Sequence, residues 1–187
     1  LAHLKMVIAV GTVMGLHAAF EIFVGGTEIS WSIIWTYLPV SLLYIGSMTL
    51  GYLGLRYIEL SVSSPICNSS GALVAVMTLL FVGGEDYSPL ALGAIVLVCV
   101  GAIGLGVVDA TEDPELRAAR QVEGNRKYSK SFLALALPAA YCLLDAAGTF
   151  ADNRVLETLD ESSANCAYEL TFLFAAVLCF IYVVFIK

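Results

Sequence analysis

Six predominantly apolar stretches follow one another along this chain of 187 residues, separated by glycine, proline, serine or charged residues. A helix needs about 20 apolar residues to cross a bilayer, because each residue rises about 1.5 Å and the hydrocarbon core is about 30 Å thick. Each stretch is long enough for one crossing. The sequence therefore predicts membrane-spanning helices at residues 4–24, 31–58, 65–82, 89–108, 132–153 and 166–186.

The composition favours a bilayer rather than water as the surrounding solvent. Hydrophobic residues make up 59% of the chain and charged residues 13%, whereas a soluble domain has roughly 45–50% and 25%. So few polar residues cannot cover a water-facing surface. Residues 91–108 are apolar on every face and lack the alternation of a membrane-spanning strand. We therefore expect an all-α membrane protein, a polytopic bundle of about six transmembrane helices.

The basic residues are distributed unevenly between the two ends of the predicted helices. With a cytoplasmic N-terminus, eight of the nine Lys and Arg residues fall on the cytoplasmic side, where such residues accumulate, and only Arg154 lies outside. Five of the eight lie in residues 109–131. We expect this polar segment to be a solvated linker with a short helix at 115–122. These features predict a multi-pass protein of the plasma (cytoplasmic) membrane.

Nothing in the sequence indicates an enzyme, a metal site or nucleic-acid binding. The five cysteines stand singly in apolar runs, without C-x-x-C spacing or a neighbouring histidine. The histidines are His3 and His17, and neither belongs to an H-E-x-x-H motif. The formal net charge of −7 gives no support to a nucleic-acid partner. We expect no catalytic residues, no cofactor and no bound metal.

Residues 52–109 carry three short motifs in a fixed order. A helix ends in the phrase Y-x-x-L-R-Y at 52–57, and a small-residue turn, S-V-S-S-P, follows at 61–65. The next helix closes on Gly84 and Glu85, before a proline and a glycine-rich helix. This order resembles helices three, four and five of the five-helix repeat in the EamA-like branch of the drug/metabolite transporter superfamily.

The resemblance implies a ten-helix transporter built from two inverted repeats. Residues 1–108 would then be helices of the first repeat, 109–131 the linker, and 132–187 the first helices of the second repeat. The chain would be a fragment, with one family helix before it and the last helices of the second repeat after it. Family members with a cytoplasmic N-terminus place this linker outside, whereas the basic residues place it inside, so the membrane orientation is left open.

The most informative polar residue is Asp145, near the middle of the fifth predicted helix. A carboxylate at the bilayer centre costs about 2.5–3.5 kcal/mol on insertion-based scales, so intramembrane carboxylates usually have a function. Tyr141, Asp145, Gly148 and Asp152 recur at steps of four, three and four, which predicts one polar stripe facing the bundle interior or a water-filled cavity. Two interpretations are open: substrate binding or proton coupling, and a protonated Asp145 that only ties two helices together.

Four further polar residues are candidates for substrate binding or proton coupling. Glu21 follows His17 by one helical turn, so the two side chains either share a proton or form a plain polar pair. Glu169 lies near the predicted outer end of the sixth helix, where access to water would lower the cost of its charge. Asn68 follows a proline at the start of the third helix, and it either lines a cavity or caps the helix.

Small residues predict close contacts between helices, because lipid removes the usual apolar driving force for association. Gly11 and Gly15 form a G-x-x-x-G pair in the first predicted helix, and Gly101 and Gly104 share a face of the fourth. These faces serve either static packing or sliding during alternating access.

The leading hypothesis for function is a secondary transporter that moves small organic solutes, drugs or metabolites by alternating access, with proton coupling as an option. The alternative is a structural or assembly subunit of a membrane complex without transport activity. The expected partners are the lipid bilayer and a small-molecule solute, and the sequence leaves the oligomeric state open.

Overall fold

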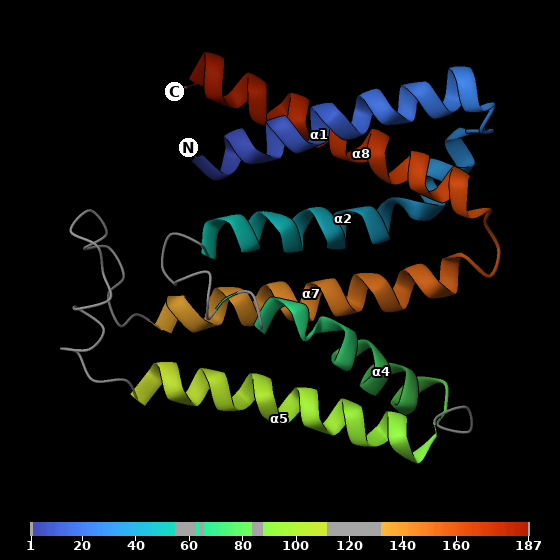
Figure 1. The fold of residues 1–187 in the computed structure, drawn as a ribbon. Coiled ribbons are helices and arrows are strands. Elements are labelled where there is room, and N and C mark those ends of the chain that lie inside the picture. The colour runs from blue at the N-terminus through green and yellow to red at the C-terminus, as the bar shows by residue number, and fades with distance from the viewer. Residues whose placement is uncertain (1, 55–62, 64–65, 84–87, 112–131, 187) are drawn as a thin grey trace. The chain divides into compact units, whose positions relative to one another are not determined.

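The computed structural model describes residues 2–54, 63, 66–83, 88–111 and 132–186. Within these ranges the chain forms helices joined by short turns, without a β-strand (Figure 1). Two π-helical turns, η1 (Glu21–Gly25) and η2 (Tyr182–Ile186), continue the first and last α-helices. The α-helices are α1 (Ala2–Phe20), α2 (Trp31–Gly54), α4 (Ser70–Phe81), α5 (Pro89–Thr111), α7 (Phe132–Val155) and α8 (Glu161–Ile181).

Each of the six predicted apolar segments overlaps one of these helices. Three stretches, Ala2–Gly25, Trp31–Gly54 and Glu161–Phe185, are long and apolar enough to cross a membrane, which is consistent with an all-α membrane protein. Two shorter apolar helices cover Ile66–Phe81 and Pro89–Gly104. The short helix predicted at 115–122 lies outside the described residues.

Helix α8 begins five residues before the predicted boundary, at Glu161 instead of residue 166. The carboxylate of Asp160 accepts a hydrogen bond from the backbone N–H of Ser163 (3.1 Å) and so caps the free end of the helix. The hydroxyl of Ser163 donates to the carbonyl of Glu28 (2.9 Å), which fixes the start of α8 against the turn before α2. Capping by Asp160 thus extends the helix into a polar stretch, which the apolar runs of the sequence do not identify as helical.

The chain divides into two compact units, one made of Leu1–Thr49 with Ala147–Lys187 and the other of Leu50–Ala146. The first unit holds α1, η1, most of α2, the last turns of α7, and α8. Its core is a cluster of four buried residues, Tyr37, Val40, Ala164 and Ala167, which α2 and α8 contribute. Because two of the four are alanines, α8 lies close to α2 at this level.

Helices α1 and α8 lie against each other within this unit (Figure 1). The contact depends on two glycines of α1. A Cβ atom at Gly11 would lie 2.6 Å from Cβ of Ala176 and 2.7 Å from the carbonyl oxygen of Phe172. One at Gly15 would lie 2.6 Å from the Leu173 side chain. The G-x-x-x-G pair therefore removes the side-chain atoms that would hold the two backbones apart.

The second unit holds the last turn of α2, then α4, α5 and the first half of α7. Gly51 of α2 packs against the ring of Tyr141, because a Cβ there would lie 2.9 Å from Cδ2 of the ring. By contrast, no atom of the described residues lies within 4 Å of a Cβ at Gly101 or Gly104. The face of α5 predicted to pack at these glycines is therefore open in the described part of the chain, because no helix there lies against it.

Candidate functional site

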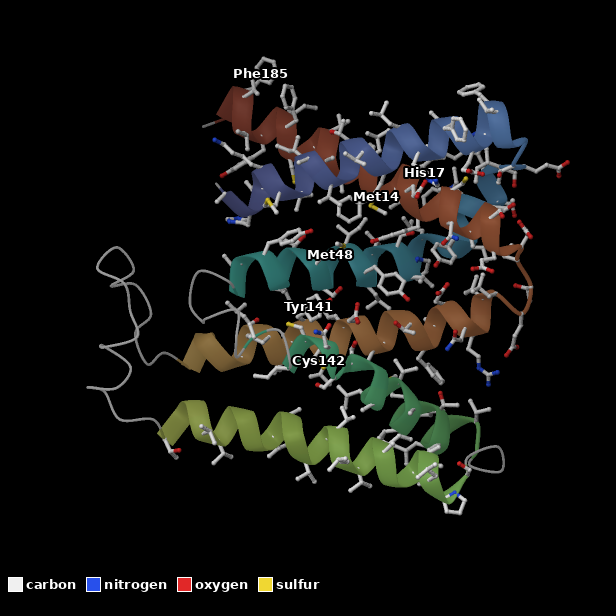
Figure 2. All side chains as sticks on the ribbon, viewed as in Figure 1. Met14, His17, Met48, Tyr141, Cys142 and Phe185 are labelled. Atoms are coloured by element: carbon white, nitrogen blue, oxygen red, sulfur yellow. The ribbon has the colours of Figure 1, made fainter. Side chains whose placement is uncertain are left out.

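Titratable side chains of the first unit meet where α1 contacts α8. The Nδ1 atom of His17 lies 3.0 Å from both carboxylate oxygens of Glu169, although the two residues are 152 positions apart. Figure 2 labels His17 on α1. The other ring nitrogen, Nε2, lies 3.8 Å from Oε1 of Glu21. The imidazole thus stands between two carboxylates, one from each of two apolar stretches long enough to cross a membrane. We refer to His17, Glu21 and Glu169 as the histidine triad.

Helix geometry explains why these three groups meet. Gly15 brings the backbone of α1 close to Leu173 of α8, one turn away from Glu169. Glu169 is the most enclosed of the three, with 14% of its side chain exposed, against 59% for His17. The sequence predicted the His17 and Glu21 pair from their spacing within one helix, but it gave no partner on α1 for Glu169.

Tyrosines of α2 and α8 form a second polar group in the same unit. The hydroxyl of Tyr37 donates to Oδ1 of Asp152 (2.6 Å), and that of Tyr44 donates to the hydroxyl oxygen of Thr149 (3.1 Å). Tyr168 of α8 stacks edge-on against Tyr44, with ring centroids 5.6 Å apart. None of the three tyrosines was among the predicted site residues, because an aromatic residue in an apolar helix is usual and carries no signal of its partner.

These contacts give Asp152 a structural partner. Tyr37 is 3% exposed, so the hydrogen bond is shielded from water and ties α2 to the end of α7. Gly148, one turn earlier, has room for the Tyr44 ring, which would lie 3.2 Å from a Cβ at that position. The half of the predicted stripe formed by Gly148 and Asp152 therefore packs against α2 within the first unit.

The Tyr37 hydroxyl provides a direct test of this tie. Replacing Tyr37 with Phe removes the donor and leaves the Asp152 carboxylate without it. We expect a loss of about 0.6–1.7 kcal/mol in the free energy of unfolding, the range found for side-chain hydrogen bonds in membrane proteins. Reversible unfolding in mixed detergent micelles measures this loss. In an Asp152→Ala background, the same Tyr37→Phe substitution should lower the free energy of unfolding by a smaller amount. Equal losses in both backgrounds would contradict the hydrogen bond.

The other half of the stripe, Tyr141 and Asp145, lies in the second unit beside two cysteines. Figure 2 labels Tyr141 and Cys142 on α7. The carboxylate of Asp145 acts electrostatically on Cys67, Tyr141 and Cys142. Cys142 is 4% exposed, and its sulfur lies 3.5 Å from the hydroxyl of Ser69. Asp145 itself is half-buried. Its neighbours are thus thiols and a phenol, none of which carries a positive charge.

Asp145 differs from Asp152 in having no donor. Among the described residues, none forms a hydrogen bond or an ion pair with its carboxylate. Asn68 lies exposed in the helical residues 66–68 that precede α4, next to Cys67. The predicted site residues therefore fall into three places: the histidine triad, the Tyr37 and Asp152 pair, and the surroundings of Asp145.

The comparisons with known proteins add no relative. No family model, curated protein or solved structure matches the chain. The resemblance of residues 52–109 to the EamA-like repeat consequently stays a prediction from the motifs themselves.

Proposed function

We propose that the protein is a secondary transporter that moves a small organic solute across the plasma membrane by alternating access. The observation that carries this proposal is the carboxylate of Asp145, which lies within an apolar helix, half-buried and without a donor among the described residues. A carboxylate that only fastens two helices has a partner, as Asp152 has in Tyr37. Asp145 is instead available for a proton or for a cationic group of a solute.

The chemistry around Asp145 supports a solute with a positively charged or hydrogen-bonding group. Burial among thiols and a phenol makes an uncompensated negative charge costly, so a proton or a cation lowers the free energy of the site. The phenol of Tyr141, one helical turn away, provides a hydrogen-bond donor and an aromatic ring of the kind that binds organic ammonium groups. Binding of either a proton or a cation, but not both, would couple solute movement to the proton gradient.

The resemblance to the EamA-like repeat implies an architecture for the proposed transporter. In that architecture the chain contributes helices from both inverted repeats of a multi-pass, ten-helix transporter, and α7 opens the second repeat. Substrate sites in inverted-repeat transporters lie near the bilayer midplane, at the interface of the repeats. Asp145 lies near the middle of α7, which supports a place for it in such a site.

One observation favours a second function, a structural subunit of a membrane complex. Helix α5 leaves Gly93, Gly101 and Gly104 open within the described residues, beside exposed apolar side chains such as Leu97 and Ile103. A smooth face of this kind suits a contact with another helix. A structural role alone, however, gives no reason for an unpartnered carboxylate at Asp145.

A flux assay separates the two functions. The full-length protein is reconstituted in liposomes and tested with amino acids, nucleosides and cationic drugs under an imposed proton gradient. We expect accumulation of at least one cationic or amine-bearing solute above the level of protein-free liposomes, and we expect a protonophore to remove it. A folded, inserted protein that moves none of these solutes with either direction of the gradient would favour the subunit.

A further inference from the structure

The histidine triad has a geometry that a neutral imidazole does not satisfy. Nδ1 of His17 faces both oxygens of Glu169 at 3.0 Å, and Nε2 faces Glu21 at 3.8 Å. A neutral histidine carries a proton on one ring nitrogen, and its other nitrogen is an acceptor. Whichever tautomer forms, one nitrogen lone pair then points toward a carboxylate, which is also an acceptor. Only the doubly protonated imidazolium offers a donor to each carboxylate.

The net charge of the triad also favours a doubly protonated His17. With both glutamates ionised, a neutral His17 leaves two negative charges close together on apolar helices. A proton on His17 lowers this net charge from −2 to −1 and turns a repulsive contact with Glu21 into an attractive one. Among the described residues, the charged groups that act on His17 are Glu169 and Glu21, and neither is a cation. A proton is therefore the charge that the site lacks.

The backbone holds Glu21 in place for this contact. Glu21 opens the π-helical turn η1, and its carbonyl accepts hydrogen bonds from the N–H groups of Gly26 and Thr27. Single π-helical turns of this kind are rare and occur frequently at functional sites. A Cβ at Gly25 would lie 2.7 Å from Oε2 of Glu21, so glycine at that position leaves room for the carboxylate.

We infer that His17, Glu21 and Glu169 form a proton-binding site at the contact between α1 and α8. The bound proton resides on the imidazole, which then donates from Nδ1 to Glu169 and faces Glu21 with a protonated Nε2 in an ion pair. Loss of the proton leaves one of the two contacts without a donor. Among the described residues, no group of three or more His, Cys, Asp and Glu side chains is arranged to hold a metal ion.

This inference goes beyond the proposed transport activity, because it stands on other residues than Asp145 and requires no solute. It can therefore fail while the transport proposal survives, and the reverse also holds. The chain has two histidines, so a His3→Asn variant leaves the His17 imidazole as its only one. Ring-nitrogen chemical shifts from 15N-labelled histidine then report the protonation of His17 alone.

The experiment uses the His3→Asn protein in lipid nanodiscs at neutral pH, without added solute. We expect both ring nitrogens of His17 to carry protons, and we expect the variant Glu21→Gln, Glu169→Gln to lose one of the two N–H signals. A neutral ring in the parent protein would overturn the inference. So would an imidazolium that persists unchanged in the variant, because the carboxylates would then have no part in holding the proton.

A milder variant protects the test against misfolding of the double substitution. Gly25→Ala keeps every charge but displaces the Glu21 carboxylate, which is flexible enough to move away. We expect it to shift the Nε2 signal more than the Nδ1 signal. Equal or absent shifts would mean that Glu21 does not contact His17, and the site would then lose one of its two acceptors.

Discussion

Replacing Asp145 with Asn in the full-length protein is expected to reduce proton-driven solute flux to the level of protein-free liposomes. Asparagine keeps the size and polarity of the side chain but carries no charge and binds no proton. Because no described residue bonds to the Asp145 carboxylate, the substitution breaks no hydrogen bond within the described part of the chain. Insertion and stability should therefore stay near those of the parent, within about 0.5 kcal/mol.

The matched control is Glu157→Gln, which removes one negative charge from the exposed segment after α7. Glu157 is engaged only at the surface, where Oε1 accepts from Arg154 at 2.7 Å with both side chains largely exposed. An exposed pair of this kind contributes about 0–1 kcal/mol. We expect flux to be kept in this variant. Unchanged flux in Asp145→Asn would remove Asp145 from the mechanism.

Replacing Gly11 with Leu is expected to separate α1 from α8. The new Cβ alone would lie 2.7 Å from the backbone oxygen of Phe172, and a backbone atom cannot turn aside as a flexible side chain can. Overpacking of a closely packed contact costs about 1–3 kcal/mol. The loss is measured as a change in the free energy of unfolding in mixed detergent micelles.

The control for this prediction is Gly101→Leu in α5. Both substitutions place the same side chain on a glycine of an apolar helix, but a Cβ at Gly101 meets no described atom within 4 Å. We expect a change within about 0.5 kcal/mol there. If Gly11→Leu were as mild as Gly101→Leu, the close approach of α1 and α8 would not hold in solution.

The positions of the helices could be predicted from the sequence, because the length of a long apolar run sets the length of the helix that it forms. Helix α2 begins at Trp31 and α7 at Phe132, as predicted from the apolar runs. The boundary at Glu161 was missed because the cap that sets it is a side-chain hydrogen bond from Asp160. Aspartate followed by acidic and serine residues is a recognised signal for a helix start, and it could have been used.

The partners of the candidate residues could not be read in the same way. Periodicity reports which residues share one face of a helix, as with His17 and Glu21, but it does not report which helix covers that face. The bond from Tyr37 to Asp152 joins residues 115 positions apart, and apolar segments of similar composition give no pairing preference. The same limit explains why Gly11 and Gly101 looked equivalent in sequence, although only Gly11 meets another helix among the described residues.

The long separation between His17 and Glu169 sets a condition on biosynthesis. At roughly 5–20 residues per second, a ribosome needs about 8–30 s to pass from the one to the other. During that interval α1 is already made, but the carboxylate that completes its polar contact does not exist. Until α8 is synthesised, Glu21 is therefore the one member of the triad that His17 can contact.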